Sequence, residues 1–514
     1  MRWQALLAIA ATYTCAGVSA APTERGFVTF GDSNVQSVLD ADYSQFAPTD
    51  DGAAFDRVKQ VSKGLQGDGD DGSTGTGHLS QWSRQNKDEF LEALRNNDAD
   101  DWIIVMGNEA GDLDSLVSAI TLSYLYNHLE TPQKAVALLQ TEQDALDLRP
   151  ENALALHYAR MSSGHRDLLT IDELPIKPND LWHRIKGIAL VDHNVPRAIW
   201  DKAEVVAIVD HHDDRGVANH TASPRIVELA GSCTSLVTGY LLETLPGANS
   251  AYPMPDYNLD EPPASLYDAE EIGESHLTTH GPLPKELIEL ILRTIAIDTD
   301  ALKHSSSRQV DIDSASRLFP HSSWKHRKMK DVMGILDDDM TQSRKALGGL
   351  DLRSLLRRDW KGDSIATKSK KYPSISIGFA SAPVSFEEQI TRTPEQTVPE
   401  WFAIERAWTA EIQADVTVAL TNFRDKKTGE KYRQIALVVA HGYGRRLHAG
   451  SADRLFKQLK HAIESAGIEG LEKWHRPDKK PLLARRAVYQ YQSAHASRKF
   501  WRPKIEQAVK DWQG

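Results

Sequence analysis

The sequence predicts an α/β protein of two domains: a larger N-terminal domain with a mostly parallel, doubly wound sheet, and a smaller C-terminal domain with a mixed sheet. Two observations support this prediction. Short apolar runs alternate with helical stretches, as in successive βαβ units. The chain also has 514 residues, and because a single core stops growing at about 250–300 residues, at least two cores are expected.

The first domain contains four apolar runs that predict strands buried on both faces, because they lack an alternating polar pattern. These runs are residues 103–106, 134–139, 187–191 and 204–209. A helix is predicted from Leu116 onward, and a second helix has Pro150 in its first turn, where proline is tolerated. An apolar helix is predicted over residues 287–297.

Acidic and imidazole side chains follow these elements. Asp112 and Asp114 lie in the loop predicted over residues 107–115, Asp192 follows its strand directly, and His211 and His212 follow the next strand. In open α/β sheets, ligands bind outside the carboxyl ends of the strands, so these side chains are candidates for chemistry. An Asp before a helix is also commonly a cap, and that alternative stays open for this loop.

A fourth acid, Asp298, ends the apolar helix. A carboxylate at a helix C-terminus faces the negative end of the helix dipole, which suggests that a cation compensates it.

Four segments are predicted along the chain: a signal peptide, a catalytic domain, a charged helical connector and a C-terminal substrate-binding domain. They are residues 1–20, 27–320, 321–346 and 347–514, respectively. Within the last segment, strands are predicted at 374–379, 416–422 and 434–440, a turn at 425–429 and an amphipathic stretch at 452–466.

The charge is uneven along the chain. The net charge is −12, yet residues 441–514 carry +9 and the rest of the chain carries −21. This balance argues against a general nucleic-acid binder. It fits one domain that binds metal cations and another that binds an anionic substrate, although solvated helix faces would produce the same distribution.

The N-terminus has an apolar stretch and a small-residue exit that are typical of a secretory signal. A secreted or endomembrane location is therefore expected, with a cytoplasmic location as the alternative. No other run is long enough to span a bilayer. The two cysteines, Cys15 and Cys233, provide no disulfide framework because Cys15 would be removed with the signal.

Four carboxylates that converge without cations would repel one another. Two divalent metal ions would relieve this repulsion. Oxygen ligands with a single imidazole favour Mg²⁺ or Mn²⁺, with Co²⁺ possible, over zinc. Two such ions activate a water and stabilise the attacking and leaving oxygens of an in-line displacement, which is phosphoester or phosphoanhydride hydrolysis.

Four motifs in order resemble those of the DHH phosphoesterase superfamily. They are Asn108-x-x-x-Asp112-x-Asp114, Asp192-His193-Asn194, Asp210-His211-His212 and Ile297-Asp298-Thr299. Asp359-Trp360-Lys361 and Ser497-Arg498-Lys499 resemble the second, DHHA2-like domain of the branch that contains family II inorganic pyrophosphatases and fungal exopolyphosphatases. The resemblance implies an active site in a cleft between the two domains.

The resemblance also implies residue roles. The implied metal ligands are Asn108, Asp112, Asp114, Asp192, His211 and Asp298, with Asp192 bridging the two ions. His212 would contact the substrate phosphate or the leaving oxygen and, with Asp192, take part in catalysis. Lys361, Arg498 and Lys499 would hold the phosphate chain, as the donor geometry of Arg and the point charge of Lys allow.

Asn108 stands where family II pyrophosphatases carry histidine, and an amide oxygen shifts the metal preference toward Mg²⁺. Asn at this position, with intact His211-His212, resembles the exopolyphosphatases. The expected function is therefore an exopolyphosphatase that releases terminal orthophosphate from inorganic polyphosphate, as a monomer. The nearest alternative is a short-chain polyphosphatase, pyrophosphatase or nucleoside polyphosphate hydrolase with the same site.

Two further alternatives are less favoured. A superfamily nuclease or cyclic-dinucleotide phosphodiesterase would carry a Gly-Gly-Gly-His motif, and the only adjacent glycines are Gly348 and Gly349. A polyanion-binding protein without catalysis is disfavoured because no acidic ligand is missing. Arg445 and Arg446 are also candidates to line a groove for a long polyanion, although charges on a helix face are the commoner explanation.

Overall fold

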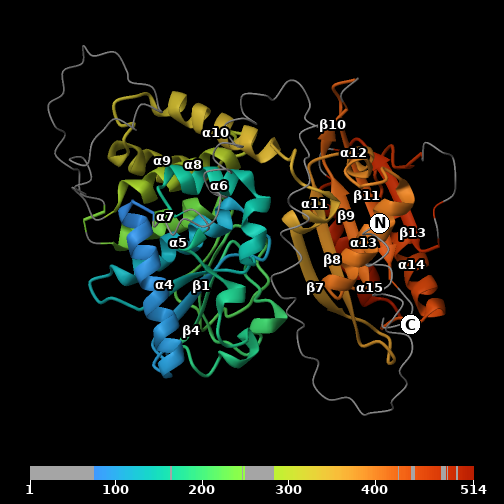
Figure 1. Cartoon of the computed structure of the whole chain (residues 1–514), viewed down its shortest axis with the longest axis horizontal. Helices are drawn as coiled ribbons and strands as arrows, with labels where there is room; N and C mark the ends of the chain where they lie inside the picture. The colour runs from blue at the N-terminus through green and yellow to red at the C-terminus, as the bar shows by residue number, and fades with distance from the viewer. Residues whose placement is uncertain are drawn as a thin grey trace. The chain divides into compact units, whose positions relative to one another are not determined.

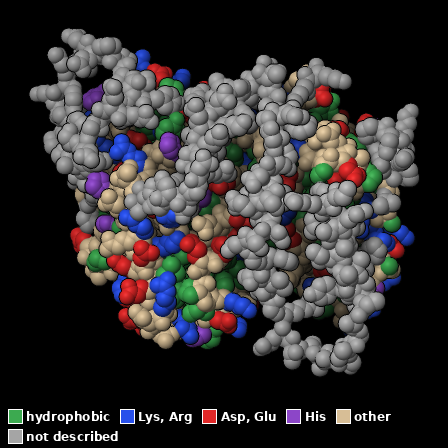
Figure 2. Space-filling model, viewed as in Figure 1, with side chains coloured by type: hydrophobic (Ala, Val, Ile, Leu, Met, Phe, Trp, Pro, Cys, Tyr) green, Lys and Arg blue, Asp and Glu red, His purple; other side chains and the backbone are tan. Residues whose placement is uncertain are grey.

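A computed structural model describes residues 75–514, apart from 163–164, 246, 249–282, 426–427, 441–445, 476–481, 483 and 494–495. The predicted signal segment, residues 1–20, and Arg445 lie outside the described residues. No helix in the described part of the chain combines the length and apolar character needed to cross a bilayer. On the face that Figure 2 shows, acidic and basic side chains are intermixed over the described part of the first domain.

The first domain contains a six-stranded sheet in which every pair of neighbouring strands is parallel (Figure 1). Its spatial order is β3-β2-β1-β4-β5-β6. The strands are β1 (Ile103–Met106), β2 (Ala135–Leu139), β3 (Leu169–Thr170), β4 (Gly187–Val191), β5 (Val205–Asp210) and β6 (Arg225–Val227). The predicted parallel sheet is confirmed, and all four predicted strands are present.

The strand order changes direction between β1 and β4, which are neighbours in the sheet but not in the sequence. In doubly wound sheets, this reversal opens a crevice outside the carboxyl ends of the two strands. The chain therefore places the residues after Met106 and Val191 beside each other at the position where such folds bind ligands.

Helices cover both faces of this sheet. Ile103 and Val105 of β1 belong to one hydrophobic cluster, and Ile104 and Met106 belong to another. A strand whose alternate side chains enter two cores is buried on both sides, which explains why β1 is apolar throughout. The helices of the first domain are α4 (His78–Asn96), α5 (Leu113–Asn127), α6 (Pro150–Tyr158), α7 (Cys233–Thr244), α8 (Lys285–Asp298), α9 (Gln309–Leu318) and α10 (Met329–Lys345).

The pairing of β4 with β5 contains a bulge. Ile188 pairs with Val205, but the next residue, Ala189, pairs with Ala207, so that Val206 is the extra residue. Val206 and Ala207 consequently face the same hydrophobic cluster. The bulge therefore determines which face of the sheet each side chain points to in the carboxyl-terminal part of β5.

The second domain has a mixed sheet in the order β12-β13-β11-β9-β8-β7, with β10 paired to β11, as predicted for its class. Among the described strands of this second domain, only the β8–β9 pair is parallel. The strands are β7 (Trp360–Ala366), β8 (Ser374–Ala382), β9 (Val416–Thr421), β10 (Phe423–Arg424), β11 (Lys431–Val439), β12 (Glu472–Lys473) and β13 (Arg486–Tyr491). The helices are α11 (Leu352–Arg358), α12 (Phe386–Thr391), α13 (Val398–Glu411), α14 (Ala449–Glu464) and α15 (Arg498–Lys510).

Several elements differ from the sequence expectation. Helix α5 begins at Leu113 rather than at Leu116, because the side chain of Asp112 accepts a hydrogen bond from the backbone N–H of Ser115 and caps the helix. Helices α4, α13 and α15 and strands β7 and β13 had no predicted counterpart. Helix α10, in the predicted connector, contributes buried residues such as Met333 and Leu336 to the first core.

Charged side chains link the end of α11 to the segment that begins α6. Arg358 contacts Glu151 at 2.6 Å, and both side chains are at most 5 % exposed. Arg357 makes ion pairs with Glu142 and Asp144. Only the Arg358–Glu151 pair is buried on both sides, so removal of either partner would leave a costly unpaired charge, whereas Glu142 and Asp144 are exposed.

Candidate active site

Asp192 lies at the centre of the site, immediately after β4. Its backbone has a φ of 58°, in the left-handed region that non-glycine residues rarely adopt. The carboxylate Oδ2 accepts hydrogen bonds from Nδ2 of Asn108 and from Oγ of Ser115, both at 2.6 Å. These two donors orient the other oxygen, Oδ1, toward the imidazoles that follow β5.

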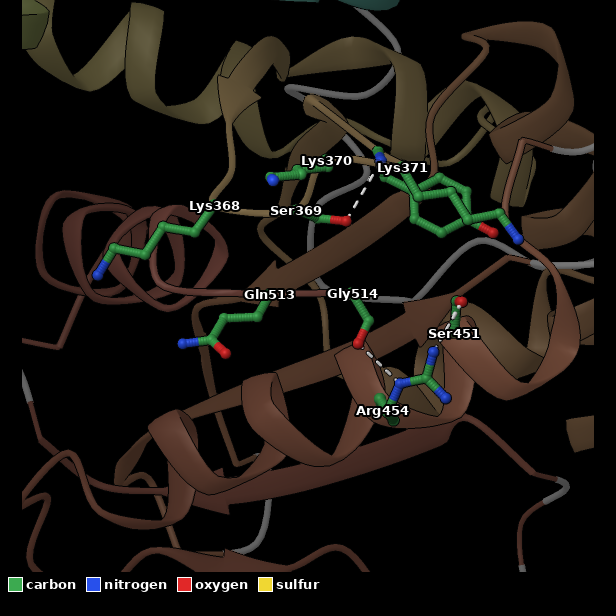
Figure 3. A pocket seen from close by; sticks show the side chains of 9 residues that line it. Lys368, Ser369, Lys370, Lys371, Ser451, Arg454, Gln513 and Gly514 are labelled. Carbon is green, nitrogen blue, oxygen red and sulfur yellow. Dashed lines mark hydrogen bonds between the residues drawn. The ribbon is translucent and has the colours of Figure 1, made fainter.

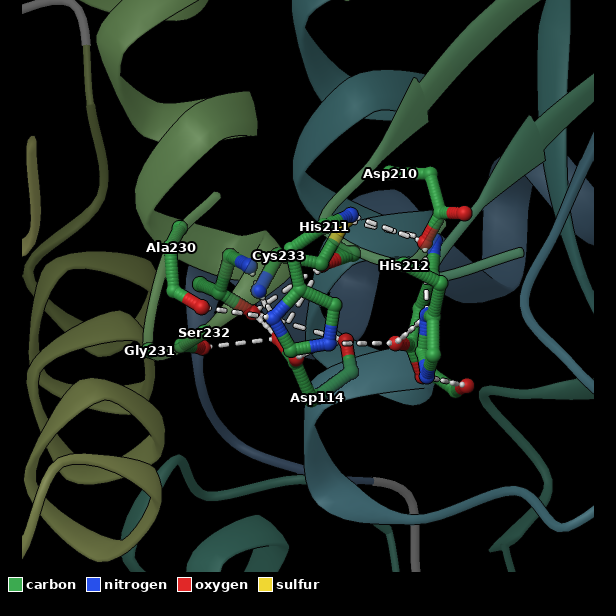
Figure 4. Close-up of polar contacts among 12 residues, drawn as sticks. Asp114, Asp210, His211, His212, Ala230, Gly231, Ser232 and Cys233 are labelled. Carbon is green, nitrogen blue, oxygen red and sulfur yellow. Dashed lines mark hydrogen bonds and ion pairs between the residues drawn. The ribbon is translucent and has the colours of Figure 1, made fainter. Parts of the chain in front are cut away.

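The imidazoles of His211 and His212 complete a cluster with Asp192. Each of the three residues offers one ligand atom, and these atoms lie within 4.8 Å of one another. The Nε2 atom of His211 is 3.2 Å from Oδ1 of Asp192, while its Nδ1 atom lies 3.1 Å from the carbonyl oxygen of Ala230 (Figure 4). The backbone carbonyl thus fixes the ring so that Nε2 faces the acids.

His212 is held by the acid at the end of β5. Its Nδ1 atom lies 2.8 Å from Oδ1 of Asp210, a fully buried carboxylate (Figure 4). The other oxygen of Asp210 accepts a hydrogen bond of 2.5 Å from Asn194. Because Nδ1 is engaged, Nε2 is the ring atom that His212 can present to a substrate.

Asp114 lies against the N-terminus of α7. Its carboxylate accepts hydrogen bonds of 2.7–2.8 Å from the backbone N–H groups of Cys233 and Thr234 and from the hydroxyls of Ser232 and Thr234. The helix N-terminus favours the negative charge there. The same carboxylate is 3.8 Å from Nε2 of His211, which brings it to the edge of the cluster.

Asp112 and Asp298 complete the acidic side of the site. Asp112 caps α5, as described above, so the capping alternative holds for its side chain. Asp298 is the last residue of α8, and its Oδ2 atom is buried without a hydrogen-bond partner among the described residues. An unpaired carboxylate oxygen at this position fits a site that binds a cation.

The raised pKa values of the buried acids also indicate a site that binds cations. Burial and the nearby charges of Asp192 and Asp112 together raise the pKa of Asp114 to about 6, although His211 opposes the shift. Burial, with the charges of Asp114 and Asp112, likewise raises the pKa of Asp298 well above its usual range. Divalent cations would relieve this repulsion, and the donor set of carboxylates with imidazole suits them.

Both polar atoms of the Asn108 amide are engaged in hydrogen bonds. Its Oδ1 atom accepts a 3.0 Å hydrogen bond from the backbone N–H of Ala110, and its Nδ2 atom donates to Asp192. In this arrangement the amide positions the carboxylate of Asp192.

The predicted phosphate-binding side chains occupy the start of β7 and of α15. Lys361 lies in β7 and lowers the pKa of the buried Asp192 carboxyl through its positive charge. Arg498 begins α15 and donates to Oδ1 of Asp359 at 2.9 Å. Lys499 follows in the same turn and is exposed.

Asp359 also lies 3.7 Å from Arg149 of the first domain, and Gly362 donates a backbone hydrogen bond of 3.1 Å to Glu109 in the loop after β1. These contacts link the start of β7 to the first domain. Arg446, the other candidate for polyanion binding, is instead paired with Asp415 at 3.5 Å.

Sequence reasoning assigned no role to Ser115, Asp210, Asn194 or Cys233. Asp210 belongs to the recognised Asp-His-His motif, so a signal for it was present. Ser115 carried no such signal, because its role depends on the turn that places its hydroxyl beside Asp192. Cys233 accepts a 3.2 Å hydrogen bond from the backbone N–H of Asp192, a contact between residues 41 positions apart.

Comparison with known proteins agrees with this architecture. A Schizosaccharomyces pombe protein provisionally named an exopolyphosphatase is 28 % identical over 288 residues, which cover 55 % of this chain and 66 % of that protein. Exopolyphosphatase PRUNE1 of Mus musculus is 25 % identical over 342 residues, covering 66 % and 63 % of the two chains. The matched regions thus span slightly less than two thirds of each relative.

Among solved structures, a Methanococcus jannaschii protein provisionally assigned as a family II inorganic pyrophosphatase aligns with a TM-score of 0.45 and 16 % identity, over 79 % of this chain and 99 % of that one. Residues 102–265 match the DHH family, N-terminal domain, and residues 338–508 match the DHHA2 domain. The chain therefore belongs to the DHH superfamily, with a DHH domain followed by a DHHA2 domain.

Proposed function

We propose that this protein is a phosphoanhydride hydrolase, and specifically an exopolyphosphatase that releases terminal orthophosphate from inorganic polyphosphate. The observation that carries the proposal is the cluster of Asp192, His211 and His212 at the switch point of a parallel sheet. The names of the relatives from Schizosaccharomyces pombe and Mus musculus support the same substrate class.

Two divalent cations, Mg²⁺ or Mn²⁺, are the proposed cofactors. The proposed ligands are Asp112, Asp114, Asp192, His211 and Asp298, with Asp192 shared between the two ions and Asn108 holding Asp192 in place. When bound, the cations supply charge neutralisation for the phosphoryl oxygens and activation of the attacking water. The raised pKa values of Asp114 and Asp298 support this assignment.

His212 is proposed to bind the transferred phosphate or the leaving oxygen through Nε2. Asp210 holds the orientation of the ring through Nδ1, so that Nε2 of His212 can hydrogen-bond a developing negative charge on the substrate. Asp210 lies within hydrogen-bonding distance of His212 Nδ1. Burial opposes ionisation of Asp210, but the contact with His212 lowers the pKa of its carboxyl below the ordinary value. It therefore stays ionised at neutral pH.

Lys361, Arg498 and Lys499 are proposed to hold the phosphate chain. Arg498 already bonds Asp359, so this carboxylate fixes the guanidinium at the start of α15. A guanidinium offers parallel N–H donors that match phosphate oxygens, while a lysine ammonium acts as a point charge.

The test is phosphate release from long-chain polyphosphate in Mg²⁺, Mn²⁺ or Co²⁺, with pyrophosphate and tripolyphosphate as short-chain comparisons. We expect release that requires a divalent cation and Asp192: Asp192→Ala should abolish turnover because it removes the shared ligand. The control is Asp88→Ala, an exposed acid on α4, which should retain full activity.

Normal turnover in Asp192→Ala would remove the site assignment. Faster release from pyrophosphate or tripolyphosphate than from long chains would favour the short-chain alternative. Binding of polyphosphate without release in any of the three metals would favour a polyanion-binding protein that lacks catalysis.

A further inference from the structure

A basic pocket lies in the second domain, away from the candidate active site. Its cavity volume is about 550 Å³. The cationic side chains that line it are Lys368, Lys370, Lys371 and Arg454, and the described lining contains no acidic side chain (Figure 3). Lys370 and Lys371 are both exposed, and four cations around one concave surface make a site for a polyanion rather than for a neutral ligand.

The backbone that carries the lysines is fixed by hydrogen bonds. The N–H of Lys368 donates to the carbonyl of Trp512 at 3.0 Å, and the N–H of Tyr372 donates to Oγ of Ser369 at 3.2 Å. The rings of Tyr372 and Trp512 stack with centroids 5.6 Å apart. The turn is therefore held against the end of the chain's last helix, which reduces the ordering cost of binding an anion.

Some of the positive charge is neutralised within the protein. Lys368 pairs with Asp511 at 2.6 Å, and Nε of Arg454 donates at 2.8 Å to the main-chain oxygen of Gly514, the last residue of the sequence (Figure 3). No ion pair involves Lys370 or Lys371 among the described residues, although the ammonium of Lys371 lies 5.4 Å from the ring centroid of Tyr372. These two lysines are the available anion-binding groups.

The pocket is connected to the predicted phosphate-binding residues by two regular elements. Strand β7 contains Lys361 near its start and leads to the lysine turn, while α15 begins at Arg498 and leads to the residues that line the pocket. A 13-residue helix is about 20 Å long. The pocket is therefore separated from Arg498, one of the proposed phosphate-binding residues, by roughly 20 Å along the second domain.

We propose that this pocket is a second binding site for the polyphosphate chain, which it holds while the chain end occupies the active site. This inference rests on the proposed function for the choice of ligand. A long chain can reach both positions, and its effective concentration at the active site rises when the remote segment is held. A short chain such as tripolyphosphate cannot span the separation and gains nothing.

The test compares Lys370→Ala/Lys371→Ala with Lys328→Ala/Lys330→Ala, which removes two exposed lysines at the start of α10. Binding of fluorescent long-chain polyphosphate is measured in EDTA, so that hydrolysis does not contribute. We expect the pocket variant to bind about three- to tenfold more weakly than the wild type and the control to change by less than about twofold.

In the kinetic arm, the pocket variant should raise KM for long chains by a similar factor. Its kcat and its KM for tripolyphosphate should stay unchanged. Unaltered long-chain binding in the pocket variant would overturn the inference. An increase in KM for tripolyphosphate as large as that for long chains would overturn it as well. Failure of the wild type to release phosphate would contradict the proposed function, while the EDTA binding measurement would still decide this site.

A single-stranded DNA of equal charge is the probe for the competing ligand class. If it binds as tightly as polyphosphate and loses the same factor in Lys370→Ala/Lys371→Ala, the pocket binds nucleic acid and the assignment of polyphosphate is overturned. DNA binding that is weak and equal in the wild type and in Lys370→Ala/Lys371→Ala supports the assignment of polyphosphate.

Discussion

At the residue scale, the two oxygens of Asp192 have separate partners. Oδ2 bonds Asn108 and Ser115, and Oδ1 faces His211. Burial opposes ionisation of Asp192, but the hydrogen bond with His211 and its charge hold the pKa of the carboxyl well below its usual range. The same contact raises the pKa of His211 to about 10 against the effect of burial. The 3.2 Å contact between Asp192 and His211 thus lies at the centre of the site proposed for the cations.

The contact between Asp210 and His212 leads to a prediction. Asp210→Asn keeps the size of the side chain but removes the carboxylate charge that faces Nδ1 of His212. We expect kcat for phosphate release to fall by about 10–100-fold, as for other carboxylates that orient a histidine. Steady-state kinetics with saturating Mg²⁺ measures this effect, and circular dichroism checks the fold. Wild-type kcat in this variant would show that Asp210 does not act through His212.

Glu405 predicts a pH dependence of stability in the second domain. It lies in α13, is 2 % exposed, and accepts hydrogen bonds from Thr409 and Thr417. Burial raises its pKa above the ordinary value of 4.5, although those hydrogen bonds and the charges of Arg486 and Arg406 oppose the shift. The folded protein then binds more protons than the unfolded chain between the two pKa values, so the free energy of unfolding decreases as pH rises above about 4.5.

Glu405→Gln should remove this contribution and flatten the dependence. Urea unfolding, followed by tryptophan fluorescence at pH values from about 4.5 to about 7.5, measures the slope. An identical slope in wild type and variant would contradict the role of Glu405.

At the element scale, β1, β4 and β5 were predictable because strands buried on both faces are continuously apolar. Helix α15 was not, since it begins with basic residues and contains Pro503. Helix α4 was also missed, because polar side chains such as Asn86 and Lys87 are buried in it through specific partners. Such partners come from tertiary structure and leave no periodic signal in the sequence.

The N-terminus of α7 gives Asp114 a structural role beside its proposed metal binding. Removal of the carboxylate leaves the N–H groups of Cys233 and Thr234 and the hydroxyl of Ser232 without their acceptor. We expect Asp114→Ala to lower the free energy of unfolding of the metal-free protein by about 1–3 kcal/mol. Urea unfolding in EDTA measures it, with the exposed Asp313→Ala as the control.

If Asp114 only bound metal, its replacement would raise the free energy of unfolding of the metal-free protein instead of lowering it. Its removal would relieve the repulsion from Asp192 and Asp112 that helps to raise the pKa of Asp114. Stabilisation of the metal-free protein by Asp114→Ala would therefore contradict the structural role.

At the scale of the whole molecule, the sequence predicted two α/β domains and the motifs that carry acids and imidazoles. It could not predict which side chains hold the site together, since Ser115 and Asn108 meet Asp192 from about 80 positions away. It also did not predict the contact of Glu151 with Arg358 or that of Asp359 with Arg498, because each joins residues more than 100 positions apart.

The buried pair of Glu151 and Arg358 provides a test of these contacts. Glu151→Ala would leave Arg358 buried without its partner, and would also remove the contact with Arg149 at 3.4 Å. We expect the free energy of unfolding to fall by about 3–5 kcal/mol, because an unpaired buried charge is costly. The double variant Glu151→Ala/Arg358→Met should recover part of this loss; a double variant less stable than Glu151→Ala would contradict the pairing.

The single extra residue in β5 has a consequence for how the site could arise or be lost. Side chains alternate along a strand, so every position after Val206 owes its direction to that insertion. Without it, the strand residues that follow, up to Asp210, would point to the opposite face of the sheet, and Asp210 would no longer hold His212. Deleting one valine in the middle of the sheet would thus dismantle the centre while leaving every one of its side chains in the sequence.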